Sequence, residues 1–216
     1  MNPTPSPEVG GAITALVQGR HQQPHDLLGQ HLESGGLRIR VLKPLAQSVQ
    51  VRFEDGVTLD LAHEAEGVWT AVRADAERTM DYRLAVAWAD GIEHVQDDPY
   101  RFAPTLGEVD LHLVNEGRHE LLWTVLGSRL HEYDGPMGPV KGVAFAVWAP
   151  RAKAVRVIGD FNDWDGRIHP MRMLGGSGVW ELFVPDVGVG NIYKYEIRGA
   201  DDVVRTKADP MARRTE

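Results

Sequence analysis

A pattern of two short strands around a proline turn occurs twice in this chain. The first occurrence is LRIRVLKPLAQSVQV at residues 37–51, and the second is VAFAVWAPRAKAVRV at residues 143–157. The two segments match position for position, with Pro44 opposite Pro150. In the first, apolar and polar residues alternate as in half-buried antiparallel strands. An internal repeat of this kind decides the architecture before any single element is assigned.

Further landmarks extend the repeat along both halves of the chain. They keep one order and one constant separation: Val68-Trp69 with Val179-Trp180, Tyr82 with Tyr193, and Asp98-Pro99 with Asp209-Pro210. Two copies of about a hundred residues suit a chain of 216 residues, because domains of that size are common. Features that both copies share are expected to be structural. A feature of one copy alone is a candidate for function.

Composition narrows the chemistry and the partners. A formal charge of -8 argues against nucleic acid or an anionic membrane as partner, because both require clustered Lys and Arg. The sequence contains no cysteine, which excludes disulfides and thiolate chemistry. Its start does not resemble a signal peptide, and no apolar run is as long as a membrane span. We therefore expect a cytoplasmic protein.

The periodicity predicts an all-β fold of two tandem immunoglobulin-like β-sandwiches, each preceded by a short helix. The first helix is expected to begin at Ser6-Pro7 and end at Gly19, and the second to cover 121–126. Strands are expected at 37–41, 49–53, 68–72, 82–88, 143–148, 154–159, 179–184, 192–197 and 203–207.

Domain boundaries follow from the repeat. A flexible amino-terminal segment with its helix is predicted at 1–24, the first sandwich at 25–105 and the second at 106–216. The sequence leaves the relative orientation of the two sandwiches open.

The second copy differs from the first by two insertions. One adds eight residues around Gly135–Pro139. The other adds five residues between Val157 and Val179, and GDFNDWDG at 159–166 lies in this longer loop. Because the first copy has no counterpart, the longer loop is the candidate functional site.

The residue types in this loop suit recognition of a neutral sugar chain. Glucose has a face of C–H groups and a rim of hydroxyls, so a flat exposed aromatic ring with polar neighbours can hold it. Trp164 would supply the ring. Asn162, Asp163 and Asp165 would supply hydrogen bonds. Lys194, on the open face of a predicted strand, could donate to sugar hydroxyls.

Other roles remain open for these residues. Trp164 could instead cover the edge of the sandwich, because large aromatic residues are often partly buried. Lys194 could be a solvated strand residue, since Arg83 stands opposite it in the first copy. Trp69 and Trp180 occupy matched positions and are assigned to packing.

We expect no metal and no cofactor. If Asp160 opened a calcium loop, Trp164 would occupy the fifth position, where an oxygen ligand belongs. The nine His residues are scattered without the spacing of metal ligands.

Four segments of the second copy resemble a known family. Residues 142–150, 157–165, 178–182 and 193–197 are similar to the starch- and glycogen-binding module that precedes the catalytic barrel in α-amylase-clan branching and debranching enzymes. Bacterial glycogen (1,4-α-glucan) branching enzymes give the closer resemblance, which rests on HDLLG at 25–29, DDPYRF at 97–102, GRH at 117–119 and HPM at 169–171.

The resemblance implies that the second copy is a glucan-binding module in which Trp164 stacks on glucose and Lys194 hydrogen-bonds it. The first copy lacks the Phe-Asn-x-Trp motif and is expected to bind glucan poorly or not at all. Some related modules have another exposed Trp after the Tyr-Lys strand, whereas this chain has DDVVR at 201–205. Affinity could therefore be weak, or the module could mainly dock against a barrel.

The family's chemistry needs two carboxyl groups on a (β/α)₈ barrel of about 250 residues. Only six residues follow Pro210, so we expect no catalytic residue in this chain. The favoured interpretation is the non-catalytic front end of a branching enzyme, with α-glucan and the barrel of the same polypeptide as partners. The alternatives are a purely structural docking module, or the front end of a debranching or trehalose-forming relative.

Overall fold

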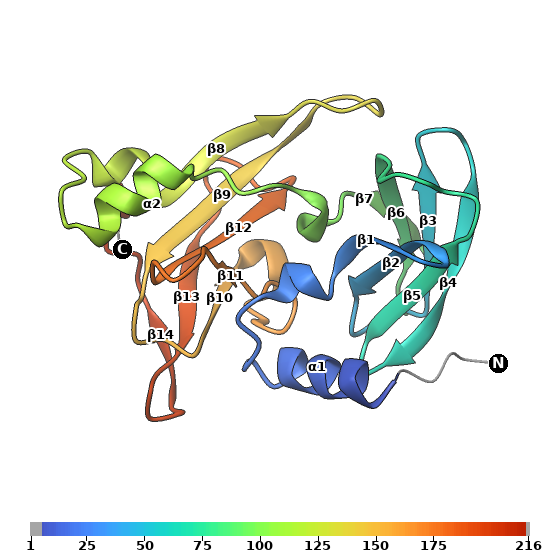
Figure 1. The fold of residues 1–216 in the computed structure, drawn as a ribbon, viewed down its shortest axis with the longest axis horizontal. Coiled ribbons are helices and arrows are strands. Elements are labelled where there is room, and N and C mark those ends of the chain that lie inside the picture. Colours follow the sequence, from blue (N-terminus) through green and yellow to red (C-terminus); the bar gives the residue numbers. More distant parts are fainter. Residues whose placement is uncertain (1–5, 215–216) are drawn as a thin grey trace.

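Strands of the first copy form one curled antiparallel sheet (Figure 1). The computed structural model describes residues 6–214. The strands are β1 (Gly29–Glu33), β2 (Gly36–Leu42), β3 (Ser48–Phe53), β4 (Thr58–Ala65), β5 (Val68–Arg73), β6 (Tyr82–Ala87) and β7 (Glu93–Gln96). Their order is β1-β2-β5-β4-β3-β6-β7. The eight-residue strand β4 pairs with both β5 and β3, with a register shift near His63, and so joins the two layers into one sheet.

The second copy keeps its two layers as separate antiparallel sheets. Its strands are β8 (Gly127–Tyr133), β9 (Val140–Trp148), β10 (Ala154–Gly159), β11 (Arg172–Met173), β12 (Val179–Pro185), β13 (Tyr193–Arg198) and β14 (Val204–Lys207). One sheet has the order β11-β12-β9-β8 and the other β10-β13-β14. The fold is the all-β sandwich arrangement that the repeat predicts. The domain boundaries at residues 24 and 105 stay a prediction.

The matched tryptophans make the same bond in both copies. Trp69 Nε1 donates to the carbonyl of Lys43, and Trp180 Nε1 donates to the carbonyl of Ala149, each at 3.1 Å. In both copies the accepting residue is the one just before the proline of the repeated turn. The repeat therefore encodes a tertiary contact, which explains why its members keep a fixed order.

Helices differ more from expectation than strands do. Helix α1 (Pro7–Val17) has the predicted start, because Ser6 Oγ accepts from Val9 N at 3.4 Å. The helix predicted at 121–126 is only a 3₁₀ turn, η3 (Leu122–Thr124), because the chain then enters β8 at Gly127, whose φ is +89°. Helix α2 (Glu108–Asn115) was not predicted, and it has no buried residue. No helix in residues 6–214 is long and apolar enough to cross a membrane.

Missed strands share one property, which is a weak apolar pattern. β1, β7 and β8 lie at sheet edges, and edge strands need only part of one face buried. β4 carries Asp60, His63 and Glu64 among its few apolar residues, and β11 is only two residues long. The remaining 3₁₀ turns are η1 (Pro24–Asp26), η2 (Pro99–Arg101) and η4 (Asp160–Asn162).

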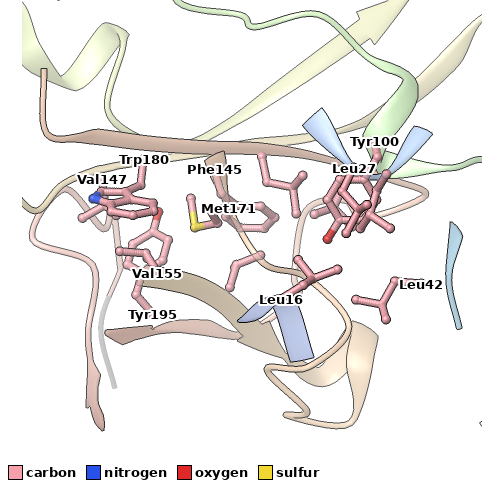
Figure 2. Close-up of a cluster of buried hydrophobic side chains, with 14 of the residues drawn as sticks. Leu16, Leu27, Leu42, Tyr100, Phe145, Val147, Val155, Met171, Trp180 and Tyr195 are labelled. Carbon is pink, nitrogen blue, oxygen red and sulfur yellow. The ribbon is translucent and has the colours of Figure 1, made fainter. Parts of the chain in front are cut away.

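One apolar cluster joins the two copies. Figure 2 shows Leu16 of α1 among Leu42 of the first copy and Phe145 and Met171 of the second. Ile13 and Leu16 are almost fully buried. The helix predicted to belong to a flexible segment is therefore part of the core, and it lies between the two halves (Figure 1). Residues 1–5 of that predicted segment lie outside the described residues.

The eight-residue insertion also connects the copies. It lengthens the β8–β9 hairpin, whose tip extends toward the first copy (Figure 1). Met137 N donates to Asp81 Oδ2 at 2.9 Å, and Arg83 donates to the Met137 carbonyl at 3.3 Å. Together with the shared cluster, these bonds fix the relative orientation that the sequence left open.

Candidate functional site

The five-residue insertion shapes the loop at residues 160–170, which we call the Trp164 loop. It begins at Asp160, directly after β10, as the turn η4. The ring of Phe161 stacks on Phe145 of the core with 5.6 Å between centroids. Phe161 also lies 5.7 Å from the ring of His169, near the end of the loop. An aromatic anchor therefore ties both ends of the loop to the sandwich.

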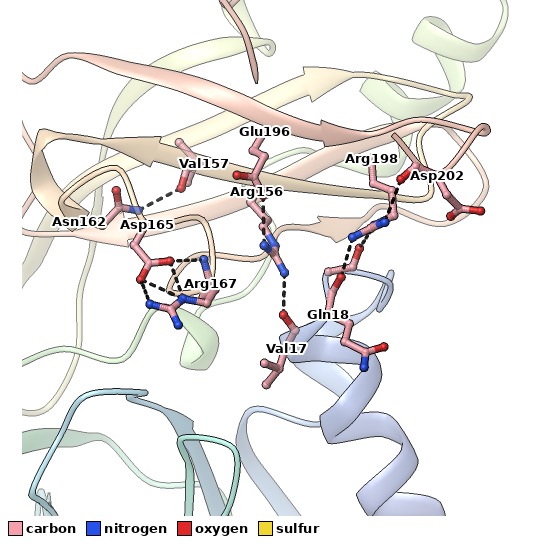
Figure 3. A network of polar contacts seen from close by, with 11 residues as sticks. Val17, Gln18, Arg156, Val157, Asn162, Asp165, Arg167, Glu196, Arg198 and Asp202 are labelled. Atoms are coloured by element: carbon pink, nitrogen blue, oxygen red, sulfur yellow. Dashed lines mark hydrogen bonds and ion pairs between the residues drawn. The ribbon is translucent and has the colours of Figure 1, made fainter. Parts of the chain in front are cut away.

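Asn162 is buried and bonded inside the loop, with only 4% of its surface exposed. Its Oδ1 accepts from Gly159 N at 2.9 Å, and its Nδ2 donates to the Val157 carbonyl at 3.0 Å (Figure 3). Nδ2 also lies 2.8 Å from His169 Nδ1. The Asn162 amide thus makes its hydrogen bonds inside its own loop, whereas the sequence analysis placed it in contact with the sugar.

The bonds of Asn162 determine the protonation of His169. Because Asn162 Nδ2 is a donor, His169 Nδ1 has to accept, which requires a neutral ring. Burial, and to a smaller extent the nearby charge of Lys43, lowers the pKa of His169 to about 3. The ring is therefore neutral at ordinary pH and serves as a fixed acceptor.

Trp164 is presented to solvent by an unusual backbone. Asp163 and Trp164 both have left-handed conformations, with φ of 52° and 59°, which costs non-glycine residues energy. Trp164 N donates to the Gly159 carbonyl at 2.9 Å, which holds the turn closed. The Trp164 side chain is 43% exposed. The sequence prediction of an exposed ring agrees with this geometry, and its role as a sugar platform stays a prediction.

Lys194 lies beside this ring. It is exposed on β13, and its Nζ is 6.0 Å from the centroid of the Trp164 ring. Its register partner on β10 is Ile158. A flat apolar ring and an ammonium group with three donors thus meet at one surface of the second copy.

Asp165 supports the far side of the turn. It accepts from Arg167 N at 2.9 Å and forms an ion pair with the Arg167 guanidinium (Figure 3). Those hydrogen bonds lower the pKa of Asp165. Asp163, by contrast, is exposed next to Trp164. Among residues 6–214 no group of three His, Asp or Glu is arranged to hold a metal ion.

A separate apolar pocket of about 320 Å³ lies elsewhere on the second copy. Its lining includes Leu122, Leu126, Trp148 and Met211. Trp148 is 55% exposed at this pocket. The pocket lining shares no residue with the Trp164 loop or with Lys194.

Two protein families match different parts of the chain. Residues 10–100 match the N-terminal domain of the alpha-1,4-glucan branching enzyme GlgB, and residues 126–212 match carbohydrate-binding module 48, the isoamylase N-terminal domain. The chain belongs to the amino-terminal region of the GlgB family. Trp164 and Lys194 lie in the part that matches the carbohydrate-binding module, whereas most of α1 lies in the GlgB part.

Relatives of the GlgB family match nearly all of this chain. A 1,4-alpha-glucan branching enzyme GlgB of Rhodococcus jostii is 51% identical over 204 residues, covering 94% of this chain and 28% of that protein. The GlgB of Thermobifida fusca is 54% identical over 200 residues, covering 93% and 27%. The chain thus spans little more than a quarter of these two relatives. A pullulanase structure from Bacillus subtilis is 17% identical, with 84% of this chain and 24% of that chain covered, but its TM-score of 0.32 is too low to bear on fold or function.

Sequence reasoning missed three residues that build the site. Phe161, His169 and Tyr100 hold the Trp164 loop through ring contacts and hydrogen bonds. Phe161 and His169 fall inside segments that resemble the family, yet neither had been given a role. The partners of Tyr100 lie 68 and 70 residues away in sequence, and no local pattern contains them. The partner of His169 lies only seven residues away, but its bond depends on how the loop folds.

Proposed function

We propose that this chain is a non-catalytic, α-glucan-binding front end of a 1,4-α-glucan branching enzyme. The observation that carries the proposal is the exposed Trp164 ring with the Lys194 ammonium group beside it. The matching place in the first copy is occupied by β4, which pairs on both sides. Glucan binding is accordingly assigned to the second copy alone.

Trp164, Lys194 and Asp163 form the proposed binding surface, which we call the platform, and each has one task. The Trp164 ring stacks on the C–H face of a glucose unit, and Lys194 Nζ donates to hydroxyls at its rim. Asp163, exposed next to the ring, can accept from another hydroxyl. Asn162 holds the turn from inside and does not touch the sugar.

Native gel electrophoresis with glycogen embedded in the gel tests the platform. We expect glycogen to retard the wild-type chain and to leave Trp164→Ala nearly unretarded. The control is Trp123→Ala, which removes a tryptophan that is 59% exposed on η3. If Trp164→Ala is retarded as strongly as wild type, the glucan-binding proposal fails.

The apolar pocket supports a second function, docking of the rest of the longer polypeptide. Met211, near the end of the described residues, lines it together with Pro210. An exposed apolar hollow is stabilised when other apolar groups cover it. We assign its cover to the barrel of the same polypeptide, because the relatives are several times longer than this chain.

The docking function is tested with the full-length enzyme. Trp148→Asp, which places a charge at an exposed position of the pocket, should lower the thermal stability of the full-length protein more than that of the 216-residue chain. Equal losses in both would show that nothing covers the pocket.

Branching activity measured on the chain alone is expected to be absent, because the proposal places catalysis on the barrel. Activity from the isolated chain would overturn the non-catalytic assignment. The cytoplasmic location stays a prediction that rests on composition.

A further inference from the structure

Tyr100 links the first copy to the end of the Trp164 loop. It lies in η2, after the last strand of the first copy, and is 6% exposed. Its hydroxyl lies 3.3 Å from the Ile168 carbonyl and 3.2 Å from the Pro170 carbonyl. Carbonyl oxygens only accept, so the hydroxyl donates and is shared between the two. Burial raises the pKa of Tyr100 well above its usual value, so the hydroxyl keeps its proton.

The first copy holds Tyr100 firmly in place. Asp98 accepts from Tyr100 N at 3.1 Å and from the Tyr82 hydroxyl at 2.7 Å. The ring of His25 meets the Tyr100 ring edge-on, with 5.1 Å between centroids. Figure 2 shows Tyr100 beside Leu27, within the cluster that joins the copies. The donor that reaches the Trp164 loop is therefore fixed from the first copy.

Helix α1 provides a second support. Arg156 Nη2 donates to the Val17 carbonyl at 2.9 Å, and its Nη1 pairs with Glu196 at 3.1 Å (Figure 3). Gly166 of the loop rests on this pair, since a Cβ there would lie 2.9 Å from Glu196 Oε1 and 3.1 Å from Arg156 Cδ. The middle of the loop thus lies on an ion pair that α1 helps to hold.

We infer that the first copy is a positioning element for glucan binding, and that Tyr100 is its main contact with the Trp164 loop. The inference rests on the proposed function. A loop with two left-handed residues loses conformational freedom when a ligand orders it, and prior fixation removes that cost from binding. The first copy therefore serves glucan binding without touching the glucan.

Tyr100→Phe tests the inference, because it removes only the hydroxyl. The matched control is Tyr133→Phe, which removes a hydroxyl that donates to the Ala103 carbonyl at 2.6 Å. Binding of maltoheptaose to the 216-residue chain is measured by calorimetry well below the melting temperature of each variant. We expect Tyr100→Phe to weaken affinity about threefold to tenfold and Tyr133→Phe to leave it unchanged.

Hydrogen exchange separates loss of position from loss of stability. In Tyr100→Phe the amides of Trp164, Asp165 and Ile168, which are bonded within the loop, should exchange faster. The amide of Leu182 in β12 should keep its wild-type rate. A uniform increase at all these amides would indicate a general loss of stability and would overturn the positioning role.

Two results distinguish this inference from the proposed function. If Trp164→Ala loses maltoheptaose binding while Tyr100→Phe binds like wild type, the proposed function stands and the positioning inference is wrong. If Trp164→Ala binds like wild type, the platform itself is wrong, and the positioning inference falls with it.

Discussion

The two copies differ most where the first has strand β4. In the first copy, β4 runs for eight residues and pairs with both neighbouring strands. In the second copy, the corresponding strand β11 has two residues and pairs only with β12. Just before β11, Pro170 keeps a single bridge to Arg156 of β10, and the residues between β10 and this bridge form the Trp164 loop. The proposed glucan-binding surface thus lies where the second copy has only a short counterpart of β4.

Breaking a strand removes backbone partners, which have to be replaced. Buried N–H and C=O groups need a hydrogen bond wherever they lie. In the second copy Asn162 takes the place of a ladder partner for Gly159 N, and Tyr100 does so for the Pro170 carbonyl. Side chains therefore add to the two backbone bonds that the end of the loop still makes with β10, at His169 and Met171. The hydrogen bonds of Asn162 and Tyr100 help to keep this short loop ordered.

The largest expected difference in stability is between variants of Trp180, which Trp69 matches in the first copy, and of Trp164, which has no match there. Trp180 is 0% exposed, so Trp180→Ala should lower the free energy of unfolding by about 3–5 kcal/mol. Trp164→Ala should lower it by less than about 1 kcal/mol, because the ring is exposed. Urea denaturation measures both. A large loss for Trp164→Ala would mean that this ring packs against the fold, as Trp180 does.

Asn162→Ala tests whether the side chain replaces the lost ladder. Two backbone groups would lose their partner, so the free energy of unfolding should fall by about 2 kcal/mol. Glucan binding should weaken too, because the turn loosens. Asn115→Ala, at the exposed end of α2, is the control and should change stability by less than about 0.5 kcal/mol. Wild-type stability in Asn162→Ala would contradict the assigned role.

Acid should weaken the fold through His169. The pKa of this ring is about 3 in the fold and 6.5 in an ordinary setting, so between these values the unfolded chain binds more protons. Stability due to His169 is complete above about pH 6.5 and falls as the pH drops toward 3. The free energy of unfolding of wild type, measured from pH 7.5 to pH 4, should therefore decrease.

His169→Gln should reduce this pH dependence, because glutamine does not titrate, but should not abolish it, because burial also lowers the pKa of His25. His94→Gln, which changes an exposed residue of β7, should leave the wild-type curve unchanged. Equal pH dependence in wild type and His169→Gln would assign the acid sensitivity to other groups.

Lys194→Met should have the smallest effect. Its three donors would be lost while the ring stays in place, so maltoheptaose affinity should fall about threefold to tenfold with little change in stability. Lys207→Met, on the neighbouring strand β14, serves as the control and should bind like wild type. In the first copy Arg83 stands at the matching position and donates to Met137, so that position connects the copies there. If both lysine variants bind equally, Lys194 does not contact the glucan.

By itself, the sequence determined the repeated architecture and the position of the exceptional loop. Both follow from patterns that stay readable along the chain: alternation around Pro44 and Pro150, a fixed separation of landmarks, and a five-residue mismatch. The sequence also marked Trp164 as exceptional, because one copy has the motif and the other does not, but it left the exposure of the ring open.

Only the tertiary structure decided how the copies join and which way Asn162 points. The apolar face of helix α1, with Ile13 and Leu16, is buried because it joins the cluster shared by both copies, and its own amphipathic pattern does not say what covers it. Asn162 turns inward because His169 and the freed backbone of Val157 offer it bonds there. Tyr100 meets the Trp164 loop across 68 residues of sequence. Local patterns predict which face of an element is apolar, but long-range packing decides what that face meets.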